Sequence, residues 1–114
     1  FVECVMRRVH IALAVANLET SITDYSARLG VDPEVVIPGK YAMWRTDGLN
    51  LSVNQLDGDR ADTPANPLRH LGFEDPAADG FSSDIDVNGI EWEIFSPAAQ
   101  DEAIRTVYGQ GDAQ

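Results

Sequence analysis

The chain has 114 residues, a net charge of −11 and 44% hydrophobic residues, which is typical of one ordinary globular domain. With 8 basic against 19 acidic residues it lacks a basic stripe to neutralise phosphates, so we expect neither nucleic acid nor a membrane as partner. No apolar run approaches a membrane span of roughly 20 residues, the N-terminus lacks a signal-peptide core, and the single cysteine excludes an internal disulfide, so a cytoplasmic protein is predicted.

Residues 8–15 are predicted to form the first strand, because apolar positions alternate along them. The apolar side chains share one face: Val9, Ile11, Leu13 and Val15. His10 lies on the opposite face, next to the small side chain of Ala12. A small neighbour leaves room beside the imidazole, so this face is a candidate wall of a cavity.

Residues 17–30 are predicted to form a helix after this strand. Asn17 is a favourable N-cap, and Gly30 is a favourable residue to end the helix. An apolar stripe runs along one side of the helix: Leu18, Ile22, Tyr25 and Leu29. We expect the stripe to cover the apolar face of the first strand, which leaves the His10 face free.

Three strands are predicted next: residues 34–37, 41–46 and 49–54. Asp47 and Gly48 are a hairpin signal between the last two. Polar side chains share one face of the third strand: Asn50, Ser52 and Asn54. Met43 and Trp44 are adjacent and therefore point to opposite faces, so one of them packs in the core while the other lines the cavity.

The second half of the chain begins with residues 55–67, whose turn formers and charges predict a linker. A second strand with a histidine follows over residues 69–73. His70 and Gly72 lie on one face of it, so this histidine also has a tiny neighbour.

Residues 74–87 carry no helical stripe, and residues 90–95 alternate as a strand. Glu91, Glu93 and Phe95 share one face of that strand. The tail from residue 97 to residue 114 is predicted to hold a short helix around residues 101–107.

The chain contains a weak internal repeat. The sequence around His10 is similar to that around His70, and the alternating segment around Ser52 is similar to that around Glu93. From His10 to Ser52 is 42 positions, but from His70 to Glu93 is only 23. The difference is about a helix plus a turn, which indicates two copies of one unit, the second without its helix.

Four segments, in this order, resemble the glyoxalase/bleomycin-resistance/extradiol-dioxygenase (vicinal oxygen chelate) superfamily: Val9–Leu13, Asn17–Gly30, Leu68–Phe73 and Asn88–Phe95. The middle of the chain is most similar to the branch of cadmium-induced proteins and organoarsenical lyases, although the paired cysteines of the lyases are absent. The resemblance implies an α+β fold in which two βαβββ modules form a curved mixed sheet around a cavity. The single domain would then span residues 1–114, divided as follows: module one 7–54, linker 55–67, truncated module two without its helix 68–96, and tail 97–114.

The resemblance also implies a metal site. His10, His70 and Glu93 match the three ligand positions of the superfamily, and two imidazoles with one carboxylate suit a divalent ion such as Fe, Zn, Mn or Ni. Alternation independently places both histidines and Glu93 on the faces opposite their apolar strand neighbours. Glu93 is also the expected catalytic residue. The candidate substrate-binding residues are Trp44, Asn50, Ser52 and Glu91.

The implied function is a metal-dependent lyase, isomerase or dioxygenase that binds a small molecule through vicinal oxygen atoms. The alternative is a non-catalytic protein that sequesters a small molecule or drug without metal, as bleomycin-resistance proteins do. A non-catalytic remnant of the fold is a third reading. The sequence leaves open whether the protein is an enzyme.

The missing second helix has a consequence for assembly. It leaves one apolar sheet face bare, formed by Leu71, Phe73, Trp92 and Ile94. Exposed apolar patches of this kind often mark interaction sites. We therefore expect a two-fold symmetric homodimer.

Overall fold

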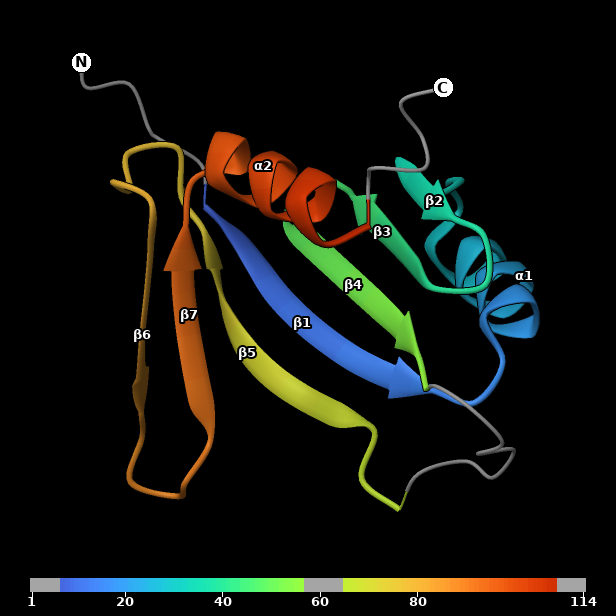
Figure 1. Ribbon diagram of the computed structural model, residues 1–114, viewed down its shortest axis with the longest axis horizontal. Coiled ribbons are helices and arrows are strands. Elements are labelled where there is room, and N and C mark those ends of the chain that lie inside the picture. Colours follow the sequence, from blue (N-terminus) through green and yellow to red (C-terminus); the bar gives the residue numbers. More distant parts are fainter. Residues whose placement is uncertain (1–6, 57–64, 109–114) are drawn as a thin grey trace.

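The computed structural model describes residues 7–56 and 65–108. In this part of the chain, seven strands form one open mixed sheet and two helices flank it (Figure 1). The elements follow in the order β1 (Arg8–Val15), α1 (Leu18–Leu29), β2 (Val35–Ile37), β3 (Tyr41–Arg45), β4 (Leu49–Gln55), β5 (Leu68–Glu74), β6 (Phe81–Ile85), β7 (Glu91–Phe95) and α2 (Pro97–Tyr108). The expected α+β class is confirmed.

The strands are arranged in the order β2-β3-β4-β1-β5-β7-β6. β1 pairs in parallel with β4, which pairs antiparallel with β3. The same pattern recurs in the second half, where β5 pairs in parallel with β7, and β7 pairs antiparallel with β6. The two histidine strands, β1 and β5, are antiparallel neighbours in the middle of the sheet.

α1 has the predicted ends. The side chain of Asn17 accepts a hydrogen bond from the backbone N–H of Thr20 at 2.9 Å, and Gly30 adopts a left-handed conformation with φ 77°. The apolar stripe of α1 packs mainly over β3 and β4, where it contacts Trp44, Leu51 and Val53. The expected cover of the β1 face is therefore only partial.

α1 covers only part of the apolar face of β1. Ile11 and Leu13 pack against the edge of this core, whereas Val9 is 44% exposed. Beneath α1, the fully buried side chain of Trp44 packs against Tyr25 of the helix.

α2 lies on the other face of the sheet, the one that carries His10 and Ser52, and crosses in front of β3 and β4 in Figure 1. It begins at Pro97, several residues before the predicted start, in agreement with the preference of proline for the first helical position. None of the helices in the described part of the chain is long and apolar enough to cross a membrane.

β6 was not predicted from the sequence. Its five residues, Phe-Ser-Ser-Asp-Ile, are all exposed, and β6 is one of the two outer strands of the sheet. As predicted, no helix intervenes between β5 and β7. Most of the predicted linker, residues 57–64, lies outside the described residues.

Candidate metal centre

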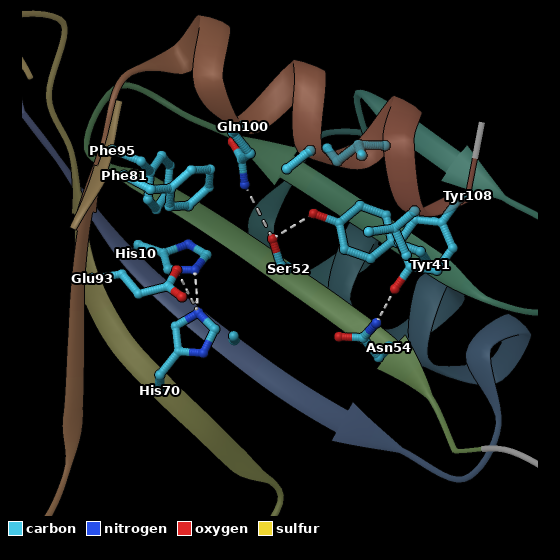
Figure 2. Close-up of a pocket in the computed structure, with 14 residues that line it drawn as sticks. His10, Tyr41, Ser52, Asn54, His70, Phe81, Glu93, Phe95, Gln100 and Tyr108 are labelled. Carbon is cyan, nitrogen blue, oxygen red and sulfur yellow. Dashed lines mark hydrogen bonds and ion pairs between the residues drawn. The ribbon is translucent and has the colours of Figure 1, made fainter. Parts of the chain in front are cut away.

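Three adjacent strands bring His10, His70 and Glu93 together (Figure 2). His10 of β1 lies opposite Gly72 of β5, and Gly72 lies opposite Glu93 of β7. His70 is two residues before Gly72 and therefore points to the same face of the sheet. The strand register alone thus places the three side chains beside one another.

The ligand atoms converge closely. The Nε2 atoms of His10 and His70 are 3.0 Å apart, and the Nε2 atom of His70 is 3.1 Å from Oε1 of Glu93. If one ligand atom is taken from each of the three residues, the three atoms all lie within 4.8 Å of one another. Two ligands bound to a cation at about 2.1 Å are about 3.0 Å apart at right angles and about 3.4 Å apart in a tetrahedral site. The donor set and its spacing therefore fit a divalent ion.

Burial and charge favour the protonation states that a metal requires. His10 is 2% exposed, and burial lowers the pKa of its imidazole, so the ring is neutral at pH 7. The hydrogen bond with His70 lowers the pKa of Glu93, which keeps its carboxylate ionised. The side chains of His70 and Glu93 are each 22% exposed, so the cluster is closed by the sheet but open on one side.

A network of polar side chains supports the cluster from within the sheet. His10 Nδ1 is 3.0 Å from Oδ1 of Asn50, and Asn50 donates a hydrogen bond of 2.7 Å to the fully buried carboxylate of Glu74. Arg8 and Arg45 both pair with Glu74. This network was not predicted from the sequence, although alternation places Arg8 on the His10 face and Glu74 on the His70 face.

The open side of the cluster faces a cavity of about 190 Å³ beneath α2. Aromatic side chains stand at its two ends, in the pairs Phe81 with Phe95 and Tyr41 with Tyr108. The hydroxyl groups of Tyr41 and Ser52 are 2.8 Å apart, and burial raises the pKa of Tyr41 to about 12. Glu93 is the one acidic side chain in the described lining.

The structure brings only part of the predicted substrate-binding set to this cavity. Ser52 lines it, and Asn50 lies behind His10, fully buried. Glu91 shares the side of β7 with Glu93 but lies opposite Ile85 at the far end of the strand, outside the cavity lining.

Trp44, the remaining predicted substrate-binding residue, lies on the opposite face of the sheet, outside the cavity lining. It is fully buried against α1, where it forms an edge contact with Tyr25 and donates a hydrogen bond of 3.2 Å to Ser26. The reason is the strand register: Trp44 pairs with Leu51, whereas Met43 pairs with Ser52 on the cavity side.

Comparisons with known proteins show a similarity in fold alone. The chain matches no protein-family model, and it matches no curated protein. Among solved structures it is similar to a chain from Legionella pneumophila described as the crystal structure of an NAD-dependent benzaldehyde dehydrogenase, with a TM-score of 0.52 and 17% sequence identity. The similarity covers 77% of this chain and 97% of that chain. At this identity the likeness describes a shared arrangement of strands and helices and transfers no activity.

Proposed function

We propose that the protein is a metal-dependent enzyme of the glyoxalase/dioxygenase-like type, a lyase, isomerase or dioxygenase that binds a small molecule through vicinal oxygen atoms. One observation carries the proposal: the ligand atoms of His10, His70 and Glu93 meet within 4.8 Å at the wall of a cavity. Three protein ligands with an open side are the pattern of a working metal site rather than a structural one.

The strand pairing supports the same assignment. In our interpretation the pattern β1-β4-β3 and its recurrence as β5-β7-β6 are two βαβββ modules, the second lacking its helix and outermost strand. The histidines then occupy equivalent positions in the first strand of each module. This is the arrangement that the resemblance to the vicinal oxygen chelate superfamily implies.

His10, His70 and Glu93 would hold the cation, which could be Fe, Zn, Mn or Ni given the mixed imidazole and carboxylate set. When bound, the cation supplies Lewis-acid polarisation of substrate oxygen atoms. The Glu93 carboxylate is placed to accept a proton from a substrate in the cavity. The aromatic pairs give the two ends of the cavity apolar walls, and Ser52 offers a hydroxyl group to a polar substituent.

The lining narrows the class of substrate. Two neutral imidazoles and one carboxylate leave a divalent cation with one net positive charge, so the centre favours a singly anionic ligand. The rest of the described lining is apolar, aromatic or neutral. The proposed substrate is therefore a compact molecule with one polar end and an apolar body.

A second candidate function is drug sequestration without metal. The observation that favours it is the pair of aromatic walls at opposite ends of the cavity, which can hold a flat apolar molecule independently of a cation. Metal-free protein that binds such molecules, and binds no cation, would select this function.

The test is a titration of chelator-treated protein with Zn²⁺, Co²⁺ and Mn²⁺ by calorimetry. We expect one cation per chain, abolished binding in His10→Ala, and an affinity at least about 10-fold weaker in Glu93→Gln because a charged ligand is lost. Glu91→Gln is the matched control, since it makes the same change on the same strand outside the cavity, and it should bind normally. Equal affinity of the two glutamine variants would refute the proposed site.

We also propose that a second copy of the chain covers the bare sheet face. The apolar side chains of that face are all only half-buried: Leu71, Phe73, Trp92 and Ile94. They lie on β5 and β7, away from the part of the sheet that α1 covers.

A further inference from the structure

A buried carboxylate stands behind the proposed metal centre. Glu74 is fully buried on β5 and accepts hydrogen bonds from three side chains on three other strands: Arg8, Arg45 and Asn50. Burial by itself would raise the pKa of Glu74, but these hydrogen bonds outweigh burial and lower it, so the group is ionised. An ionised carboxylate only accepts hydrogen bonds, so the direction of each contact is fixed.

The same reasoning fixes the orientation of the Asn50 amide. Gln100 Oε1 lies 2.9 Å from Nη2 of Arg45, which can only donate, so this atom of Gln100 is an acceptor. The Nδ2 atom of Asn50 is 2.7 Å from both Oε1 of Gln100 and Oε1 of Glu74. Nδ2 must therefore donate to two acceptors, and Oδ1 is the atom that faces His10.

The tautomer of His10 follows. Its Nδ1 atom is 3.0 Å from Oδ1 of Asn50 and 3.2 Å from the backbone carbonyl oxygen of Asn50, and both of these atoms only accept. Nδ1 must therefore carry the proton. The neutral ring then keeps its lone pair on Nε2, the atom 3.0 Å from Nε2 of His70.

We infer that Asn50 is a positioning residue of the metal centre: its amide, oriented by Glu74 and Gln100, holds the Nδ1 proton of His10 and so presents the Nε2 lone pair to the cation. The inference rests on the proposed function for the identity of the ligand. Its physical basis is general, because hydrogen bonds behind a histidine ligand set its tautomer and ring orientation. Gln100 belongs to α2, so the helix above the cavity takes part in holding the ligand.

Two measurements test this inference. Long-range ¹H–¹⁵N spectra of chelator-treated protein show which ring nitrogen carries the proton, and His70→Ala assigns the signals because the chain has only 2 histidines. We expect the Nδ1–H form for His10. The Nε2–H form in the wild-type protein would overturn the inference, and this result requires no variant of Asn50 to fold.

The second measurement is a Zn²⁺ titration of Asn50→Leu against Gln55→Leu. Gln55 is an amide on the same strand that accepts a hydrogen bond of 2.8 Å from the backbone N–H of Leu18, away from the cluster. The backbone carbonyl of residue 50 still accepts from His10 Nδ1 in Asn50→Leu, so we expect a smaller fraction of the Nδ1–H form rather than its complete loss. We also expect Asn50→Leu to lose about 10–100-fold of Zn²⁺ affinity, and Gln55→Leu to match the wild type in both respects. Asn50→Leu that matches Gln55→Leu in both respects would overturn the inference.

The two proposals fail in different ways. Wild-type protein that binds none of Zn²⁺, Co²⁺ and Mn²⁺ refutes the proposed function, yet the tautomer of His10 in the metal-free protein still tests the hydrogen bond from His10 to Asn50. Conversely, the wild-type protein could bind Zn²⁺ although His10 is in the Nε2–H form in the metal-free state. That result would leave the proposed function intact and refute the role of Asn50.

Discussion

Gly72 is the residue at which a single methyl group should disturb the metal centre most directly. A Cβ atom built at this position would lie 2.1 Å from the backbone carbonyl oxygen of Glu93, and 2.9 Å from its backbone C and N atoms. These atoms belong to β7, the strand that pairs with β5 at this position. Because the obstacle is backbone, no side-chain rotation relieves it, and Gly72→Ala must push the two strands apart.

The structure gives the size of the effect. Bringing the new contact to 3.0 Å, the lower limit for real Cβ atoms, requires a movement of about 0.9 Å. Overpacking of this kind costs about 1–3 kcal/mol, which corresponds to a loss of very roughly 5–20 °C in Tm for a domain of this size. Metal sites tolerate ligand displacements of about 0.2 Å, so a shift of Glu93 with its strand should also weaken Zn²⁺ binding at least about 10-fold.

The assay compares Gly72→Ala with Gly48→Ala by thermal unfolding and Zn²⁺ titration. Gly48 makes a matched control because an added Cβ there meets nothing within 4 Å and its φ is not positive. We expect Gly48→Ala to change stability by less than about 1 kcal/mol and to leave Zn²⁺ affinity unaltered. If the two variants unfold at the same temperature and bind Zn²⁺ equally, the argument from strand spacing is wrong.

Three further predictions follow from the structure. The pKa of His10 is lowered by burial from its usual value of 6.5, so below about pH 6.5 the unfolded chain binds a proton that the folded chain does not, and the metal-free protein loses stability. Between about pH 7.5 and 5.5, the Tm of the wild type should therefore fall more than the Tm of His10→Gln. Equal falls in Tm would contradict this prediction. Trp44→Phe should cost about 1–2 kcal/mol in denaturant unfolding while Zn²⁺ affinity is retained; lost affinity with unchanged stability would return Trp44 to the site. Light scattering after size-exclusion chromatography should give a dimer at micromolar concentration for wild type and a monomer for Leu71→Arg, whereas a monomeric wild type would exclude the dimer.

Alternation in the sequence was sufficient to place each candidate ligand on the face opposite the apolar residues of its own strand. His10 and His70 each lie opposite apolar neighbours on their own strand, and this pattern survives in the structure because β1 and β5 pair in the middle of the sheet. The ends of α1 could be predicted in the same way, because the capping residues Asn17 and Gly30 act only on the nearest turn of the helix. Features of this kind depend on a few consecutive residues, so they can be predicted from the sequence without knowledge of the fold.

Other features depend on partners that are distant in sequence. Alternation separates Met43 from Trp44 but does not say which of them lies on the cavity side of the sheet, because that depends on the register with β4. Glu74 resembles a solvated charge at the end of a strand, and its burial is evident only once Arg8 and Arg45 are in place. β6 has no buried face, so its sequence carries no alternation of apolar and polar residues.

The arrangement around Arg45 has a consequence for ligand entry. Its guanidinium group bonds Glu74 in the sheet, Glu34 before β2, and both Gln100 and Asp101 on α2. A motion that lifts α2 to admit a bulky molecule would remove two hydrogen-bond acceptors, Gln100 and Asp101, from the Arg45 guanidinium group. It would also remove Gln100 from the side-chain amide of Asn50, which holds the imidazole of His10. Lifting α2 would therefore also weaken the hydrogen bonds that orient His10, so the proposed ion would be bound most tightly while α2 stays packed on the sheet.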